Sequence, residues 1–191
     1  TYSRVQRAIV SDLDPSHFPD SPIVPFGRPV HDRLRLEVAR GCSRGCRFCQ
    51  AGMIYRPVRE RPLTDILGLT RRALENTGYE DLSLLSLSTG DYSCIEALLQ
   101  NLLTGGSCGP VAVSLPSLRA GTLTPQMMKY IKRVRKTGFT IAPEAGSQRL
   151  RDVINKNIGE AEILDTVRSA FELGWQVIKL YFMVGLPTET D

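Results

Sequence analysis

A short pattern that occurs three times constrains the fold of this sequence more than any other feature. An amphipathic stretch with helical spacing ends at a glycine, and an aromatic residue then begins an apolar stretch with the composition of a strand. The three junctions are Thr77-Gly78-Tyr79, Thr137-Gly138-Phe139 and Leu173-Gly174-Trp175. Glycine suits this place because it readily adopts the left-handed conformation that commonly ends a helix. Helices that alternate with strands in this way predict an α/β fold with a mainly parallel sheet.

Hydrophobic periodicity extends this alternation over most of the chain. It predicts strands at residues 35–40, 82–87, 111–115, 139–142 and 176–184, and helices at 63–76, 93–104, 124–138, 148–154 and 161–173. Two helix starts carry local signals. Ser93-Cys94-Ile95-Glu96 has the pattern of a capping box, and Thr124-Pro125 places a capping side chain before a proline at the first helical position.

Right-handed crossovers between the parallel strands would curve the sheet into a barrel or part of one. About five strands exclude an eight-stranded barrel, and a six-stranded barrel still lacks a strand. We therefore expect residues 34–191 to form a partial TIM-type barrel that belongs to a longer protein. Residues 1–33 carry five prolines between Pro15 and Pro29. Such a stretch favours an extended lead-in or linker, which we expect to follow another domain.

Composition excludes several classes of protein. The 42% of hydrophobic and 23% of charged residues are ordinary for a globular domain, and no apolar run reaches the length of a membrane span. Five cysteines, three of them clustered, do not make a disulfide framework, and no secretory signal is visible. Both observations favour a reducing compartment, and hence the cytoplasm.

Arginines are concentrated in one part of the chain. The net charge is only +4, but residues 28–72 contain eleven arginines and four acidic residues. This excess fits a solvated surface as well as a surface for an anionic substrate or a nucleic acid. Charge alone does not establish nucleic-acid binding.

Three cysteines lie within eight residues, at Cys42, Cys46 and Cys49, with the spacing C-x₃-C-x₂-C. The apolar run at residues 34–39 precedes them directly, so they lie on the loop at the carboxyl end of the first strand, where α/β proteins hold their chemistry. Thiolates this close together indicate a metal centre, and Gly41 and Gly45 let the backbone approach a bulky one.

Two kinds of metal centre remain open from the residues themselves. Structural zinc needs four ligands, and either Cys94 or Cys108 could supply the fourth. A four-iron cluster held by three cysteines instead leaves one iron open to a reactant. A disulfide within the triplet is disfavoured in a reducing compartment.

With Phe48 before the last cysteine, the motif C-x₃-C-x-Φ-C resembles the signature of the radical S-adenosylmethionine (radical SAM) superfamily. The resemblance implies that Cys42, Cys46 and Cys49 ligate a 4Fe-4S cluster whose open iron binds S-adenosylmethionine. We then expect the three sulfurs to converge at the carboxyl end of the sheet. It also implies reductive cleavage into methionine and a 5′-deoxyadenosyl radical, with an electron donor such as flavodoxin or ferredoxin.

Later strand ends resemble further elements of the same family. Ser88-Thr89-Gly90-Asp91 is similar to its motif for the methionyl amino group, although Asp91 stands where glutamate is common. Residues 143–147 correspond to its ribose-contacting segment, and residues 183–189 to its adenine element, in which Phe182 replaces the first glycine. The resemblance thus implies these cofactor-binding residues: Phe48, Thr89, Gly90, Asp91, Ser114, Glu144, Ser147, Arg149, Val184, Gly185 and Leu186. Among them, Ser114 and Arg149 are candidates for the methionyl carboxylate.

More narrowly, residues 47–53 and 142–146 look like a largely uncharacterised subgroup whose barrel usually follows a cobalamin-binding-type domain. This likeness favours cobalamin-assisted methyl transfer, with cobalamin held outside this chain. Methylthio transfer to RNA or protein and simple hydrogen abstraction remain alternatives within the family. A zinc-stabilised binding module and a plain electron-transfer protein are alternatives outside it. The substrate is not identified by these residues.

Overall fold

The computed structural model of the chain describes residues 4, 6–27, 29–104, 111–115, 118–122, 124–134 and 139–190. Five strands run parallel to their hydrogen-bonded neighbours, which confirms the predicted α/β class. They are β1 (Leu34–Glu37), β4 (Asp81–Leu85), β5 (Ala112–Ser114), β6 (Phe139–Glu144) and β7 (Ile178–Phe182). No described helix is long and apolar enough to cross a membrane.

These strands form two hydrogen-bonded sheets instead of one. β1, β4 and β5 pair in that order, β6 pairs with β7, and no ladder joins β5 to β6 in the described part of the chain. A third, two-stranded sheet was not predicted. It pairs β2 (Ala39–Arg40) antiparallel with β3 (Arg59–Glu60), so the predicted strand 35–40 is interrupted at Val38.

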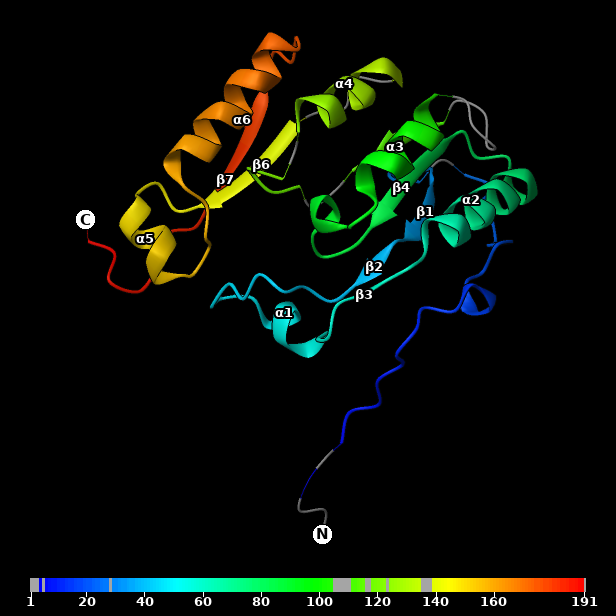
Figure 1. Cartoon of the computed structure of the whole chain (residues 1–191), viewed down its shortest axis with the longest axis horizontal. Coiled ribbons are helices and arrows are strands. Elements are labelled where there is room, and N and C mark those ends of the chain that lie inside the picture. The colour runs from blue at the N-terminus through cyan, green and yellow to red at the C-terminus, as the bar shows by residue number, and fades with distance from the viewer. Residues whose placement is uncertain are drawn as a thin grey trace.

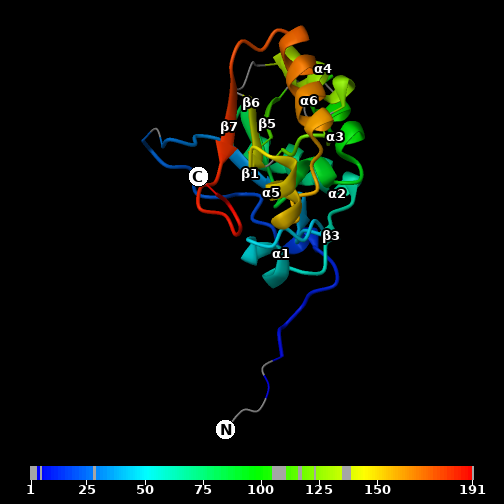
Figure 2. The ribbon, with the colours of Figure 1, turned by 90° about the vertical axis from the view of Figure 1, so that its left-hand side faces the viewer.

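The longer helices cover one side of the parallel strands, as expected for part of a barrel (Figure 2). They are α2 (Leu63–Thr77), α3 (Ile95–Leu103), α4 (Pro125–Val134) and α6 (Glu160–Glu172). Two shorter helices are α5 (Gln148–Val153) and α1 (Gln50–Ile54), of which α1 was not predicted. Two 3-10 turns, at Pro15–His17 and Thr89–Asp91, complete the described elements. In Figures 1 and 2, α1 and α5 lie at the carboxyl end of the strands.

One hydrophobic core joins the two parallel sheets in spite of the missing ladder. Leu36 and Leu84 of the first sheet and Ile141 of β6 belong to the same buried cluster. Helix residues complete that cluster, among them Ile66, Leu69, Leu98, Leu99, Leu102, Met127, Met128 and Ala170. Burial of side chains from both sheets therefore holds the two parts of the barrel together.

The glycine signals at two of the three junctions are confirmed. Gly78 has φ 70° and donates its N–H to the Leu74 carbonyl, and Gly174 has φ 90°. The third junction, at Gly138, lies outside the described residues, as does the predicted end of helix 124–138. The cap at Thr124 is also confirmed, because its Oγ1 accepts the Met127 N–H at 3.2 Å.

The capping box predicted at Ser93 is wrong. Helix α3 begins at Ile95 after Cys94, and no side chain caps it. Ser93 instead donates both its N–H (3.0 Å) and its hydroxyl to the Glu60 carboxylate of β3. The Glu60 carboxylate, 33 positions away, thus binds the groups of Ser93 that a capping box would have used within the helix start.

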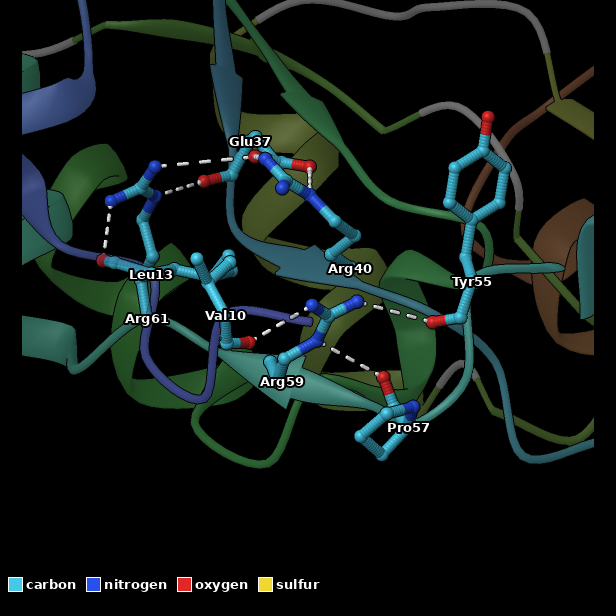
Figure 3. A network of polar contacts seen from close by, with 8 residues as sticks. All are labelled: Val10, Leu13, Glu37, Arg40, Tyr55, Pro57, Arg59 and Arg61. Atoms are coloured by element: carbon cyan, nitrogen blue, oxygen red, sulfur yellow. Dashed lines mark hydrogen bonds and ion pairs between the residues drawn. The ribbon is translucent and has the colours of Figure 1, made fainter. Parts of the chain in front are cut away.

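The lead-in is attached to the barrel by arginines from β3 and its surroundings (Figure 3). Arg61, 4% exposed, donates to the carbonyl oxygens of Leu13 (2.6 Å) and Glu37 (2.9 Å). Arg59 donates to the Val10 carbonyl at 3.0 Å, and Leu13 itself is buried. The division into a lead-in at residues 1–33 and a barrel from residue 34 stays a prediction.

We expect Arg61→Ala to lower the free energy of unfolding by about 2–3 kcal/mol, because it leaves buried carbonyl groups without a donor. Protease cleavage near Leu13 should become faster. Chemical denaturation and timed proteolysis measure the two effects. Arg72→Ala is the matched control, since Arg72 binds Asp20 at an exposed site and should change stability by about 1 kcal/mol or less. Equal effects of the two substitutions would contradict this role for Arg61.

Candidate functional site

The cysteine loop, residues 41–49, follows β2 at the carboxyl end of the first sheet. The segments that leave β4, β6 and β7 lie at the same end, so the predicted site residues from four parts of the chain share one side of the fold (Figure 1). This placement follows from parallel strands, whose carboxyl ends meet at one edge.

Gly41 fixes the start of the loop against the segment that follows α1. It has φ 96°, and a Cβ atom there would lie 2.6 Å from the Tyr55 carbonyl oxygen and 2.7 Å from that of Pro57. Gly45 is also left-handed, at φ 72°. The two glycines predicted to shape the loop therefore do so, and only Gly41 is also required by the close approach of another backbone.

Cys42, Cys46 and Cys49 are half-buried free thiols. Their sulfurs do not converge as expected: among the described residues, no three histidine, cysteine or acidic side chains lie close enough together to hold a metal ion. Backbone contacts fix the loop, and thiols have no mutual attraction until a metal draws them together. As donors they nevertheless fit an iron–sulfur cluster, because three soft ligands stand on one short loop.

Cys94 does not support the zinc alternative as a fourth ligand. That residue precedes α3 and receives a contact from the Ser93 hydroxyl at 3.8 Å, but it forms no metal-binding group with the other described ligand types. Cys108 lies outside the described residues.

Asp91 is joined directly to the cysteine loop. Arg44, between the first two cysteines, donates Nε to Asp91 Oδ2 at 2.7 Å and Nη2 to Oδ1. The Arg44 N–H also points to the Cys42 sulfur at 3.4 Å. Arg44 was not among the predicted site residues, because nothing in the sequence pairs it with an acid 47 residues away.

The ion pair determines the charge of Asp91. Partial burial by itself would raise the pKa of this carboxyl, but hydrogen bonds from Arg44 and Ser88 and the charges of Arg44 and Arg119 lower it below its ordinary value. The bond to Asp91 likewise raises the pKa of Arg44 against the opposing effect of burial. Asp91 is therefore a carboxylate at neutral pH, as a binding site for an ammonium group requires.

Two adjoining cavities open beside these residues. One, of about 210 Å³, is lined by Cys42, Ser43, Ser88 and Asp91 among others. The second, of about 360 Å³, is lined by Glu37, Arg40, Tyr55, Leu85 and Leu87 together with Gly41. Both cavities are lined by Ala39, Gly41 and Ser86, so the start of the cysteine loop borders both of them.

The turn between α5 and α6, residues 154–158, docks on the cysteine loop and was missed in the sequence. The Asn155 side chain donates to the Gly45 carbonyl at 2.8 Å, and the Ile154 carbonyl accepts the Arg47 N–H at 2.9 Å. Asn155 and Asn157 have φ 54° and 52°. Two asparagines between helices do signal a turn, but not its distant partner.

Lys156, a residue of this turn, contacts both Glu144 and Phe48. Lys156 Nζ lies 2.9 Å from Glu144 Oε1 and 5.7 Å from the centroid of the Phe48 ring. The Lys156 and Glu144 side chains are 11% and 16% exposed. Two predicted site residues almost a hundred positions apart are thus linked by a residue that was not predicted.

The remaining predicted residues lie around the same end of the strands. The Ser147 hydroxyl caps α5 by accepting the Leu150 N–H at 3.3 Å, and Arg149 donates to the Thr188 hydroxyl (2.8 Å) and carbonyl (2.9 Å). Thr89 is buried, and its hydroxyl accepts a hydrogen bond from Ser86 at 3.1 Å.

The loop after β7 is arranged by a single acid. Gly185, at φ 79°, and Leu186 donate their N–H groups to Glu189 Oε2 at 2.6 and 2.8 Å. Val184 is 93% exposed. Ser114 lies within β5 in register with Ser83, and no hydrogen bond in the described structure joins it to the cysteine loop or to Asp91.

Comparison with known families identifies the chain. The family model described as the Radical SAM superfamily matches residues 36–191, which is most of the sequence. The chain belongs to the radical SAM superfamily. This membership implies a 4Fe-4S cluster and S-adenosylmethionine as cofactors, so it favours iron over zinc at the three thiols.

Curated relatives show how much of a longer protein the chain represents. It is 45% identical over 156 residues to an uncharacterised protein of Methanocaldococcus jannaschii, covering 82% of this chain and 34% of that protein. It is 31% identical over 94 residues to the ribosomal protein uS12 methylthiotransferase RimO of Paramagnetospirillum magneticum, covering 48% of this chain and 21% of that enzyme. The chain thus spans about a third of the length of the first relative and about a fifth of the second.

Solved structures confirm the fold. The radical SAM methyltransferase TsrM from Kitasatospora setae, determined with cobalamin and a 4Fe-4S cluster, superposes with a TM-score of 0.67 at 13% identity, over 83% of this chain and 32% of that one. The cobalamin-dependent radical enzyme OxsB gives 0.58 at 17% identity, over 78% and 23%. At these identities the likeness establishes a partial radical SAM barrel and no further property.

We expect Gly41→Ala to destabilise the chain by about 1–3 kcal/mol and to reduce iron uptake, because a Cβ atom would press on two backbone carbonyls at a left-handed position. Denaturation of the apoprotein and iron content after anaerobic reconstitution measure the two effects. Gly27→Ala is the control, since nothing lies within 4 Å of a Cβ atom there. A Gly41→Ala protein as stable as the control would show that the loop does not depend on this contact.

Proposed function

We propose that the chain is the catalytic barrel of an enzyme that cleaves S-adenosylmethionine reductively to a 5′-deoxyadenosyl radical. The observation that carries this proposal is the bond between Arg44 of the cysteine loop and Asp91, because Asp91, the predicted ammonium-binding carboxylate, lines one cavity together with Cys42. When bound, the 4Fe-4S cluster supplies the electron that breaks the carbon–sulfur bond. The protein binds and orients the reactant.

The predicted residues divide into those that hold the cluster and those that bind S-adenosylmethionine or support its site. Cys42, Cys46 and Cys49 hold the cluster. Asp91 accepts the methionyl ammonium group, and it does so without releasing Arg44, since a carboxylate offers about four acceptor positions and the guanidinium uses two. Arg44 also supplies a positive charge next to the methionyl carboxylate.

Further groups hold the rest of the cofactor. Glu144 and Ser147 serve the ribose. The backbone at residues 184–186 serves the adenine, and Arg149 stabilises that loop through Thr188. Thr89 and Gly90 shape the turn that presents Asp91. Ser114 remains a candidate for the methionyl carboxylate, with the least structural support.

Cobalamin-assisted methyl transfer is the reaction class we favour. The support is the fold shared with TsrM, determined with cobalamin bound, and with the cobalamin-dependent OxsB, together with the likeness to a subgroup with an upstream cobalamin-binding-type domain. In this proposal the cobalamin lies in a domain outside this chain. Methylthio transfer is the second candidate, and the RimO relative favours it.

The electron donor in this proposal is an acidic protein such as flavodoxin or ferredoxin. Arg47 and Arg56 are exposed on either side of α1, and Met53 between them is 65% exposed. Positive charges around an apolar patch suit an acidic partner. We place the reaction in the cytoplasm, where the four free cysteines of the described structure would stay reduced.

Cys46→Ala in the full-length protein should abolish cleavage of S-adenosylmethionine and lower the iron content from about four atoms per barrel. Anaerobic reconstitution with iron and sulfide, followed by dithionite and S-adenosylmethionine, provides the measurement. Cys94→Ala is the matched control and should retain both properties. Zinc in place of iron in the purified protein, or full cleavage by Cys46→Ala, would refute the proposed function.

Asp91→Asn should raise the dissociation constant for S-adenosylmethionine by roughly 10- to 100-fold, the value of one charge-assisted hydrogen bond. Iron content should stay unchanged. Equilibrium binding to the reconstituted protein measures the effect. Glu60→Gln is the control, because Glu60 lines the same cavity but serves Ser93. Unchanged binding by Asp91→Asn would remove this carboxylate from the site.

A further inference from the structure

Lys156 occupies a turn whose backbone leaves it little freedom. Its own N–H donates to the Arg151 carbonyl at 2.8 Å, and asparagines in the left-handed conformation stand on both sides. Arg151, 2% exposed, donates to the carbonyl oxygens of Ala145 (3.1 Å), Gly146 (2.9 Å) and Ile158 (3.0 Å). One buried guanidinium thus fixes the turn to the segment that follows β6.

The partner of Lys156 is held in an unfavourable conformation. Glu144 ends β6 at φ 68°, next to an irregularity in its pairing with β7. A residue other than glycine in this region costs about 1–3 kcal/mol and persists where the surrounding structure or a function requires it. The carbonyl of Glu144 accepts the Met183 N–H at 2.8 Å, which fixes the backbone, and its carboxylate reaches Lys156.

Stability does not account for this ion pair. Both side chains are largely withdrawn from water, and a pair in such a place often contributes no more than apolar residues of the same size. The Lys156 ammonium also lies over the Phe48 ring, so it has one neighbour in the cysteine loop and one in the predicted ribose site.

The turn contacts the cysteine loop within both intervals between cysteines. Asn155 binds Gly45, between Cys42 and Cys46, and Ile154 and Lys156 contact Arg47 and Phe48, between Cys46 and Cys49. A shift of the loop therefore moves the turn, and with it the ammonium that holds Glu144.

We propose that Lys156 is a positioning residue that sets the Glu144 carboxylate according to the state of the cysteine loop. The proposal rests on the proposed function, because it takes Glu144 to bind the ribose of S-adenosylmethionine. Lys156 itself need not touch that molecule. It acts through Glu144, and the contact with the Phe48 ring couples the position of its ammonium group to that of the cysteine loop.

The test measures binding of S-adenosylmethionine to the reconstituted full-length protein, together with iron content and unfolding of the apoprotein. Lys156→Met should raise the dissociation constant about tenfold, or 1.4 kcal/mol, with the iron content unchanged. Lys156→Arg, which keeps the charge and the contact with the ring, should stay within about threefold of wild type. Lys179→Met, at an exposed position of β7, is the control for removing a lysine.

A double-mutant cycle separates positioning from a merely structural role. If Lys156 acts through Glu144, Lys156→Met combined with Glu144→Gln should bind no more weakly than Glu144→Gln alone. Additive losses would overturn the proposal, as would unchanged binding by Lys156→Met or by Glu144→Gln. Since Glu144→Gln preserves side-chain shape, it tests whether the Glu144 carboxylate takes part in binding even if Lys156→Met does not fold. A wild-type protein that does not bind S-adenosylmethionine refutes the proposed function instead.

Discussion

The contact between the cysteine loop and the turn after α5 is the interaction on which this arrangement depends. The parallel strands divide into two sheets without a ladder between them in the described structure, so backbone pairing does not fix one half relative to the other. The shared core supplies attraction, but apolar contacts are not directional. The hydrogen bond that Asn155 donates to the loop and the one that the Ile154 carbonyl accepts from it supply direction, and both lie beside the three cysteines.

Charge is organised around the same loop by pairing each acid with a cation from another element. Arg44 holds Asp91, and Lys156 holds Glu144. Two carboxylates that the resemblance assigns to one small molecule are therefore each paired with a cation without that molecule. Prior orientation of this kind reduces the entropy lost on binding.

Most of the fold could be predicted from local signals, and most of the support of the site could not. The helix ends at Gly78 and Gly174 could be predicted because a glycine's left-handed conformation depends on its immediate neighbours. The apolar strands could be predicted because their hydrophobic pattern lies within a few consecutive residues. The short pieces α1, β2 and β3 carry too few residues for any period. The capping pattern at Ser93 was misleading, because the carboxylate of Glu60, distant in the sequence, binds Ser93 instead. Arg44 and Asn155 bind partners 47 and 110 positions away, and Lys156 contacts the ring of Phe48 in the distant cysteine loop, which no pattern in a single sequence reveals.

The arginine contacts of the lead-in have a geometric consequence for anything attached ahead of it. Arg7 donates to the carbonyl groups of Ile54 and Arg56, so the path of the chain is pinned beside the end of α1. Helix α1 begins directly after Cys49, and its five residues span roughly 7.5 Å. Any domain attached ahead of Arg7 would therefore stay within a short distance of the cysteine loop. It would approach the barrel at the carboxyl end of the strands, where the candidate site lies.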